Sequence, residues 1–481
     1  MERQSGSNSL ENIRISYIGK NIEQDTTDNV KIKREKTSLI KQCLIDYTAN
    51  TNLHGLKYVG EKERTTVENL DIPYPAVTLC PEMKVMQTVF NYTEHYHLKE
   101  TNPNTTEEPD HLFEDVSLIC NKNVAPWIRG RTFSLGNKTV ENIKKVSPTI
   151  HDIMGPLMWK DKIFRSSDLF SPILTEEGYC YTFNTIGADE LFRIENLNTD
   201  YNYYDSLNKS QSWTLENGYL PNTPLETYPH RGTGYGENAG LLNVLRASEK
   251  DFDYLCSGPT QGYKIILHNP AEFPKLSQHY FRIPLERDVV VAVKPKMMTT
   301  SNGLKPYSPV RRQWYFSSER YLNFFKVYTQ ANCETECLTN FTYARCGCVH
   351  FGMPLELVTV EIQNNLKEAT NADDTIGEAH HIATNCKCLP ACTSIEYEAE
   401  TSQADFNVYA LLKAMNSRIT ETGFLYTQIK IFFKEAQFIK VRRSELYGHT
   451  DFLANCGGLL GLFLGFSLLS VVEFIYFFTL R

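Results

Sequence analysis

Cysteine thiols are the most numerous potentially reactive groups in this sequence. Of its 13 cysteines, 11 lie between Cys80 and Cys392, several of them in tight spacings: Cys333-x3-Cys337, Cys346-x-Cys348 and Cys386-x-Cys388-x3-Cys392. Two chemistries suit such spacings. Thiolates this close together can ligate zinc, whereas a high density of cysteines is typical of disulfides formed in an oxidising compartment.

Glycosylation signals favour disulfides over zinc. One Asn-x-Ser/Thr sequon arises easily by chance, but five fall inside the cysteine-rich span, at Asn91, Asn104, Asn137, Asn208 and Asn340. Sequons and cysteines confined to the same region indicate a secreted or extracellular environment. We therefore predict that residues 65–450 form a disulfide-rich, glycosylated extracellular domain.

A single carboxylate stands out near the C-terminus because its neighbours are apolar. Residues 452–472 contain no charge, and the apolar character continues to Leu480, interrupted only by Glu473. This length spans the hydrocarbon core of a bilayer as a helix. A charge inside such a helix costs roughly 2.5–3.5 kcal/mol on insertion scales. Glu473 is therefore either neutral or lipid-facing, or it belongs to a water-facing ring of carboxylates that concentrates cations.

Small residues form a stripe along the same segment. Gly457, Gly461 and Gly465 recur every four residues and so share one helix face. Such a stripe allows helices to pack closely, and it also allows backbone carbonyls to line a narrow ion path. Ser467 adds a hydroxyl to this region, with a hydrogen bond to the Phe463 carbonyl as its alternative role.

The elements that position these groups are mixed. Residues 265–267 and 289–293 are apolar runs typical of buried strands, and residues 428–434 alternate as a half-buried strand does. Residues 354–381 have helical spacing, and the aromatic-rich segment 201–204 is expected in a surface loop. We predict an α+β membrane protein with three parts: a cytosolic region (1–64), the extracellular domain (65–450) and a transmembrane pore helix (451–481).

Five ordered stretches resemble the degenerin/epithelial sodium channel superfamily, most closely the pickpocket-type subunits of arthropods. They are His54-Gly55, residues 73–80 (PYPAVTLC), 178–184 (GYCYTFN), 386–392 (CKCLPAC) and 457–473. The last contains a Gly-x-Ser element. The element is unspecific by itself, but the ordered set covers most of the chain and is highly specific.

The resemblance implies a sodium-selective, amiloride-sensitive channel in the plasma membrane. Its partners would be sodium ions, membrane lipid and homologous subunits in a homo- or heterotrimer. The ectodomain would have a β-rich core and a helical, disulfide-stapled thumb. The roles implied are a selectivity filter at Gly465, Phe466 and Ser467, and pore or gating positions at Ala454, Asn455, Glu473, His54 and Gly55.

The resemblance also implies three disulfides, to which we add Cys120–Cys256 as a further expectation. The three are Cys80–Cys180, Cys333–Cys388 and Cys337–Cys386. Trp314 stands where the family has a cysteine, so the resemblance leaves Cys392 without its partner. Cys346 and Cys348 lose their expected partners in the same way.

The largest departure from the family is an absence. No apolar stretch of spanning length lies between Gly55 and residue 73, where family members have their first membrane helix and a linker strand. A splice form, an incomplete gene model and an engineered deletion are the competing explanations.

Three functions therefore compete: a channel subunit, a non-conducting regulatory or dominant-negative form of one, and a single-pass adhesion or receptor protein. Glu473 and the Gly-x-Ser element count against the third. The sequence has no P-loop, G-x-S-x-G or H-E-x-x-H motif, which argues against an enzyme. The net charge of −8 and the lack of a long basic block give no indication of nucleic-acid binding. We predict no cofactor and no metal.

Overall fold

The computed structural model describes a discontinuous set of residues. They are residues 66–68, 72–101, 109–120, 138–197, 204, 209–210, 213–232, 234–276, 279–346, 349–354, 386–416, 422–445, 449–465 and 467–479. The His54-Gly55 pair and residues 355–381 of the expected helical segment lie outside the described residues.

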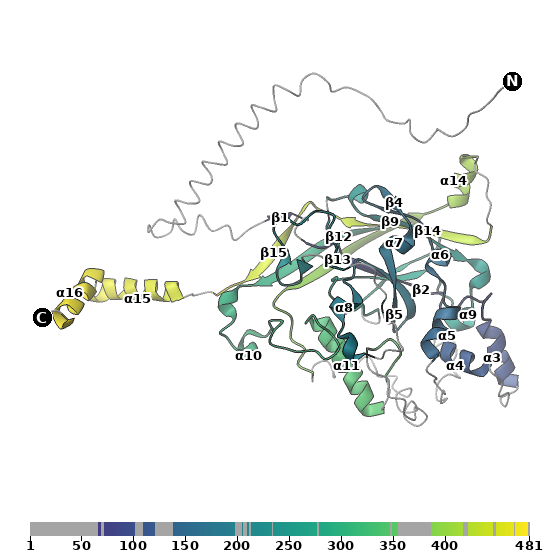
Figure 1. Cartoon of the computed structure of the whole chain (residues 1–481). Coiled ribbons are helices and arrows are strands. Elements are labelled where there is room, and N and C mark those ends of the chain that lie inside the picture. The colour runs from purple at the N-terminus through teal and green to yellow at the C-terminus, as the bar shows by residue number, and fades with distance from the viewer. Residues whose placement is uncertain are drawn as a thin grey trace, which may run out of the picture. The chain divides into compact units, whose positions relative to one another are not determined.

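The larger sheet has eight strands within the described part of the chain (Figure 1). Its order is β1 (Thr66–Glu68), β15 (Gln437–Arg443), β12 (Arg287–Thr300), β14 (Phe424–Phe433), β9 (Leu241–Ser248), β3 (Met154–Trp159) and β4 (Lys162–Phe164), with β13 (Ser394–Asp405) also paired to β12. The strands expected at residues 289–293 and 428–434 are confirmed. They pair in parallel with Val291 opposite Ile431, both buried.

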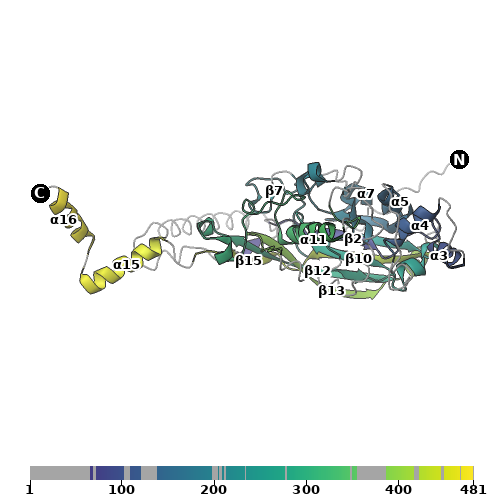
Figure 2. The same ribbon diagram turned by 90° about the horizontal axis from the view of Figure 1, so that it is seen from below.

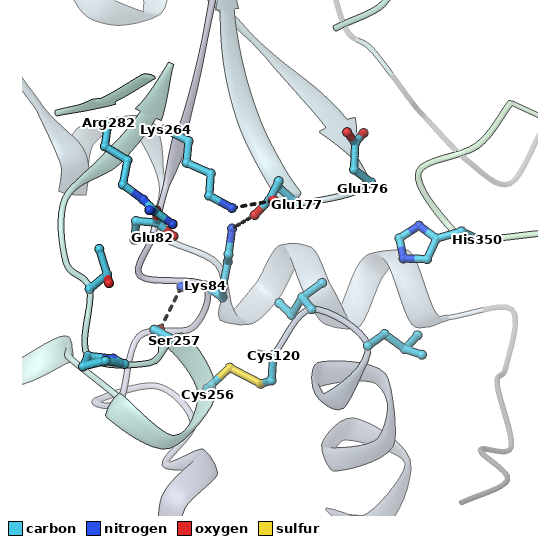
Figure 3. Close-up of a pocket in the computed structure, with 14 residues that line it drawn as sticks. Glu82, Lys84, Cys120, Glu176, Glu177, Cys256, Ser257, Lys264, Arg282 and His350 are labelled. Carbon is cyan, nitrogen blue, oxygen red and sulfur yellow. Dashed lines mark hydrogen bonds and ion pairs between the residues drawn. A yellow bond between two sulfur atoms is a disulfide. The ribbon is translucent and has the colours of Figure 1, made fainter. Parts of the chain in front are cut away.

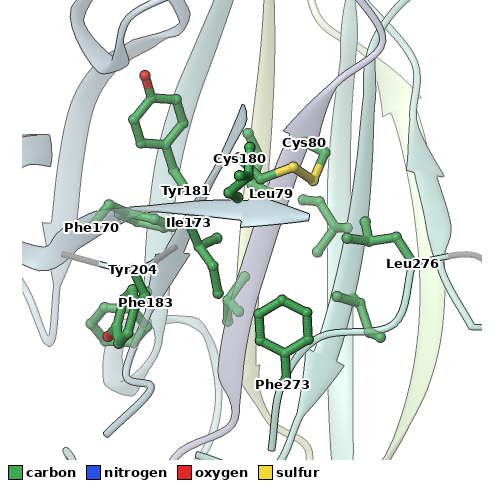
Figure 4. Close-up of a cluster of buried hydrophobic side chains, with 14 of the residues drawn as sticks. Leu79, Cys80, Phe170, Ile173, Cys180, Tyr181, Phe183, Tyr204, Phe273 and Leu276 are labelled. Carbon is green, nitrogen blue, oxygen red and sulfur yellow. A yellow bond between two sulfur atoms is a disulfide. The ribbon is translucent and has the colours of Figure 1, made fainter. Parts of the chain in front are cut away.

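The smaller sheet has five strands in the described residues and contains the strand expected at 265–267. Its order is β11 (Phe281–Ile283), β10 (Tyr263–His268), β2 (Ala76–Pro81), β6 (Gly178–Phe183) and β5 (Phe170–Thr175). All six residues of β2 are buried. The Cys80–Cys180 disulfide joins β2 to β6 beside the apolar cluster that includes Leu79, Ile173 and Phe183 (Figure 4).

Short elements surround the two sheets. They are the hairpin β7 (Trp213–Thr214) and β8 (Gly218–Tyr219), and the helices α3 (Tyr92–Thr101), α4 (Pro109–Ser117), α5 (Thr139–Val146), α6 (Ile150–Ile153), α7 (Ser166–Leu169), α8 (Ala188–Leu191), α9 (Tyr254–Ser257), α10 (Pro309–Arg312), α11 (Gln330–Cys346) and α14 (Val408–Ala414). Helices α3, α4 and α5 group together in both views (Figures 1 and 2). The Cys120–Cys256 disulfide links the end of this group to α9.

Helix α11 is fastened by two disulfides on one face. Cys333 and Cys337 are four residues apart and therefore neighbours on the helix, and they pair with Cys388 and Cys386. All four expected disulfides are thus present in the structure, and the α+β class is confirmed. Zinc would need these cysteines as free thiolates, so the two disulfides remove four of the closely spaced ligands on which the zinc alternative rested.

One tyrosine joins the two sheets. Tyr74, just before β2, is fully buried, and its hydroxyl donates a 2.6 Å hydrogen bond to the carbonyl of Ile431 in β14. Its ring packs edge-on against Trp159 of β3 at 4.6 Å, against Phe433 of β14 at 5.5 Å and against Phe183 of β6 at 6.0 Å. The residue therefore contacts both sheets through polar and apolar atoms.

We predict that Tyr74→Phe lowers the free energy of unfolding by about 1 kcal/mol, because it removes a buried hydrogen bond and keeps the ring. Tyr74→Ala should cost about 3–5 kcal/mol, because it also opens a cavity. Thermal denaturation of the detergent-solubilised full chain measures both. Tyr235, which is 64% exposed, supplies the matched control. If the thermal denaturation midpoint of Tyr74→Ala were as high as that of Tyr235→Ala, the role assigned to Tyr74 would be contradicted.

Candidate functional site

The C-terminal apolar segment forms two helices, α15 (His449–Leu464) and α16 (Leu468–Thr479), with a break between them. The pore helix predicted over residues 451–481 is thus divided in two, and its role in the membrane stays a prediction. Gly465 lies in the break with φ of +62°, a left-handed conformation that glycine adopts without strain and that commonly ends helices. Among the described residues, no individual helix combines the length and apolar character needed to cross a membrane.

Ser467 caps the start of α16. Its hydroxyl oxygen accepts a hydrogen bond from the Ser470 backbone N–H at 3.3 Å, and the Ser470 hydroxyl accepts one from the Ser467 N–H at 3.3 Å. This reciprocal arrangement resembles a capping box, in which side chains satisfy the free N–H groups at a helix start. The Ser467 hydroxyl thus hydrogen-bonds to the first turn of α16, and not to the Phe463 carbonyl that the sequence offered as its alternative partner. Our sequence analysis missed Ser470, although its Ser-x-x-Ser spacing was a usable signal.

The small residues of α15 face open space in this single chain. A side-chain carbon built at Gly457, Gly458 or Gly465 would meet no atom of the described structure within 4 Å. Ala454 and Asn455, one turn earlier, are exposed on the same helix. Among the described residues, no packing partner requires glycine at 457 or 458, whereas the left-handed backbone favours glycine at 465.

Large apolar side chains of the two helices are exposed alongside the glycines. Leu462 and Phe463 are 80% and 76% exposed on α15, and Leu469 is 74% exposed on α16. Contiguous apolar surface of this kind marks a site for lipid or for another protein chain. Glu473 is exposed on α16, three residues from Ser470, and these two polar side chains share a helix face.

The structure therefore brings Gly465 and Ser467 together at one helix break, with Ala454 and Asn455 before it and Glu473 after it. Phe466, His54 and Gly55 lie outside the described residues. The filter, pore and gating roles of all these residues stay predictions.

A second charged site lies between α9, the residues that follow α4 and the smaller sheet (Figure 3). It is a cavity of about 350 Å³. Lys84 and Lys264 each form a 2.6 Å ion pair with Glu177, and all three side chains are largely buried. Burial alone would raise the pKa of Glu177, but the charges and hydrogen bonds of Lys84 and Lys264 outweigh it and lower the pKa to about 2.

Cys392 is a buried free thiol, as its missing partner implied. Burial, followed by the neighbouring Glu216 carboxylate at 3.3 Å, raises the pKa of the thiol to about 11 and keeps it unreactive at neutral pH.

The cysteines expected to lack partners in the same way, Cys346 and Cys348, have side chains outside the described set. Among described residues, no group of three or more His, Cys, Asp or Glu is arranged to hold a metal ion.

Two of the five sequons fall on described asparagines. Asn340 is exposed on α11. Asn91 is half-buried and caps α3, its side-chain oxygen accepting a hydrogen bond from the Glu94 N–H at 3.1 Å. Asn104, Asn137 and Asn208 lie outside the described residues. Glycosylation stays a prediction for all five.

Comparison with known proteins identifies the family to which this chain belongs. The family model described as amiloride-sensitive sodium channel matches residues 56–477. The chain belongs to this family. Membership makes it an ion-channel subunit and argues against an enzyme.

The most similar relatives include insect and mammalian members of the family. Pickpocket protein 28 of Drosophila melanogaster is 28% identical over 528 residues, covering 100% of this chain and 83% of its own length. The sodium channel protein Nach of the same species is 22% identical and covers 92% of this chain and 87% of its own length. Acid-sensing ion channel 2 of Rattus norvegicus is 23% identical and covers 83% of this chain and 71% of its own. The first match is longer than the 481-residue chain, so that relative has stretches with no counterpart here.

We predict that Ser467→Ala destabilises the first turn of α16 by about 1 kcal/mol, because a backbone N–H loses its cap. Hydrogen–deuterium exchange of the first-turn amides of α16 should then be about fivefold faster. Ser467→Thr keeps the hydroxyl and is the matched control. Equal protection in the alanine and threonine variants would show that Ser467 is not the cap.

We also predict that Glu177 stabilises the fold and that this stabilisation is lost in acid. The pKa of Glu177 is lowered in the folded state. Its contribution to the free energy of unfolding is therefore complete at pH values above about 4.5, the ordinary carboxyl pKa, and is lost as the pH falls toward about 2. Thermal midpoints of the wild type between pH 7 and pH 3 should therefore fall more steeply than those of Glu177→Gln, which starts lower at pH 7.

The matched control for Glu177 is Glu141→Gln, which breaks an exposed pair with Lys145 and should change stability little. Parallel pH profiles for the wild type and Glu177→Gln would contradict the assignment.

Proposed function

We propose that this chain is a subunit of a trimeric, sodium-selective, amiloride-sensitive cation channel in the plasma membrane. Homologous subunits, identical or different, are its partners, and sodium ions are its substrate. The observation that carries the proposal is the helix break at Gly465–Ser467 between two apolar helices. Non-helical backbone at membrane depth is tolerated only where it is buried in protein or lines a water-filled path.

The surroundings of the break support an ion path. The left-handed backbone at Gly465 ends the hydrogen-bonding pattern of α15 and frees carbonyl groups, and such carbonyls can replace the hydration water of an ion. Gly457 and Gly458 leave open space along α15, which allows three copies of the helix to approach one axis. In this arrangement Gly465, Phe466 and Ser467 form the selectivity filter.

The remaining residues take supporting roles in the proposal. Glu473 follows the filter, and three copies form a carboxylate ring that raises the local cation concentration. Ala454 and Asn455 line the outer part of the path, where movement of α15 opens or closes it. His54 and Gly55 contribute to gating from the cytosolic side.

The domain over residues 65–450 is extracellular in this proposal. Its four disulfides need an oxidising compartment to form and persist. Its glycans would be attached at the five sequons. The wide separation in sequence of Cys120 from Cys256, 136 residues, makes that cross-link especially effective in restricting the unfolded chain.

A second candidate is a non-conducting regulatory form of such a subunit. The observation that favours it is the short connection between Gly55 and Pro73, which contains no apolar run of spanning length. Such a chain would assemble with intact subunits through its ectodomain and α15, and would lower their current.

Voltage clamp of oocytes separates the two candidates. The full chain is expressed alone and together with an intact homologous subunit, and surface delivery is verified by biotinylation. Current that is blocked by amiloride and lost when sodium is replaced by N-methyl-D-glucamine supports the channel. No current alone, with a reduced partner current, supports the regulatory form. A surface-delivered chain that neither conducts nor alters its partner would refute both.

We predict that Glu473→Gln lowers the sodium current roughly threefold at low ionic strength, because the carboxylate ring no longer concentrates cations. The loss should shrink at high ionic strength, where the charges are screened. Glu435→Gln removes an ectodomain surface carboxylate that pairs with Lys294 at 3.8 Å and is the control. A loss of equal size at both ionic strengths would contradict the electrostatic role.

A further inference from the structure

A cavity of about 310 Å³ lies beside the hairpin of β7 and β8, and the proposed channel function does not use it. Much of its wall is apolar and buried, and consists of Trp213, Leu215, Ala271, Tyr328 and Ala391. An apolar wall with a few polar groups is the usual lining of a site for a small molecule.

The wall is held in shape by hydrogen bonds between segments that are far apart in the sequence. The Tyr328 hydroxyl donates a 2.6 Å hydrogen bond to the Leu389 carbonyl. The Cys392 backbone N–H donates one to the Tyr315 carbonyl at 2.8 Å. These bonds lie within one chain, so the wall is preformed, and a preformed site loses less conformational entropy when a ligand binds.

The size and the side chains of the cavity match an aromatic ring system. A dry cavity of about 150 Å³ holds one benzene ring, so the volume here accommodates two fused rings with a short side chain. Trp213 and Tyr328 are both buried members of the wall. Their rings offer aromatic surface, against which another ring packs edge-on or offset.

One carboxylate lines the cavity without a cationic partner. Glu216 lies in the turn that joins β7 to β8. Its Oε1 accepts hydrogen bonds from the Ser317 N–H at 3.1 Å and from the Cys392 thiol at 3.3 Å. In the described part of the chain, no basic side chain forms an ion pair with this carboxylate.

The Glu216 carboxylate stays ionised at neutral pH. Partial burial by itself would raise the pKa of Glu216, but hydrogen bonds from Ser317 and Cys392 and the charge of Lys305 outweigh it and keep the pKa below the ordinary carboxyl range. The charged residues of the lining are Glu190, Glu216 and Lys326, so its net charge is negative. A ligand that carries a positive charge is therefore favoured, and the apolar wall strengthens the attraction because it lowers the local dielectric constant.

We propose that this cavity binds a small aromatic amine, whose rings pack against Trp213 and Tyr328 and whose ammonium group pairs with Glu216. The site gives the domain over residues 65–450 a binding function besides ion conduction. The claim is independent of the channel proposal, because binding is measured without any current.

Photolabelling of the full-length chain in lipid nanodiscs tests the site. The probe is tryptamine with an azide on its benzene ring, unmodified tryptamine is the competitor, and peptide mass spectrometry after reduction locates the label. We expect saturable labelling of the peptides that contain Trp213 and Ala391, and protection of both by tryptamine. Skatole, which keeps the indole rings and lacks the ammonium, should compete about fivefold less well, as expected for one partly exposed ion pair.

Variants separate the charge from the volume. Glu216→Gln should weaken labelling about fivefold and remove the difference between tryptamine and skatole. Ala391→Leu fills the cavity and should weaken labelling about tenfold. Should Ala391→Leu fail to give a monodisperse protein, Val327→Phe fills the same cavity from a less buried position. Glu195→Gln removes an exposed carboxylate outside the lining and is the matched control for Glu216→Gln.

Two results would overturn the site itself: the absence of tryptamine-protected label in both peptides, or wild-type labelling in the cavity-filling variant. Equal competition by skatole and tryptamine, or an equal effect of Glu216→Gln and Glu195→Gln, would overturn the pairing of an ammonium group with Glu216. Because labelling needs no conduction, failure of the channel proposal would appear separately, in the voltage clamp.

Discussion

The packing of Tyr74 between the two sheets is the constraint on which the arrangement of the two described sheets depends. Pro73 and Pro75 restrict the backbone on both sides of it to extended conformations. Tyr74 then donates its N–H to the His230 carbonyl at 2.7 Å, and its carbonyl accepts a hydrogen bond from the Asn184 side chain at 2.5 Å. With its hydroxyl on Ile431, the residue is held at three points, so β2 can lie only one way against the larger sheet.

Disulfides reinforce the attachment of the short helices. The helices α3–α5 are short, and their attachment is reinforced by Cys120–Cys256 and by the buried pairs of Lys84 and Lys264 with Glu177. Helix α11 is fastened by two further disulfides. Near Trp314, by contrast, the cysteine of the family is replaced, and the join relies on backbone hydrogen bonds and one aromatic stack.

In the proposed channel, the C-terminal segment has to satisfy two opposing demands. An apolar surface suits lipid, yet an ion path needs polar groups that the hydrocarbon region penalises. The break at Gly465 reconciles them, because the left-handed glycine ends α15 and Ser467 with Ser470 caps α16. In a continuous helix, the backbone groups at the break would form intrahelical hydrogen bonds. The break leaves these groups without intrahelical partners at a single depth, whereas the rest of each helix keeps its internal hydrogen bonds.

The sequence by itself determined the types of several elements and the position of the apolar segment. Periodicity and β-branched runs predicted the strands around Ile265, Val291 and Ile431, because burial on a pleated face leaves a local pattern. Family resemblance supplied three disulfides. The candidate pore residues were also readable, since a carboxylate or a glycine stripe is conspicuous in an apolar run.

Only the tertiary structure decided which segments meet. Tyr204, expected in a surface loop, is buried with its hydroxyl on the Thr185 carbonyl at 2.8 Å. Glu177 forms ion pairs with Lys84 and Lys264, and Trp314 stacks against Arg443, although long stretches of sequence separate these partners. The helix break was also undetermined, because a glycine in an apolar helix is tolerated unless capping groups stabilise an interruption. Local pattern fixes how a segment folds, whereas the choice of partner depends on shape and charge that many distant segments create together.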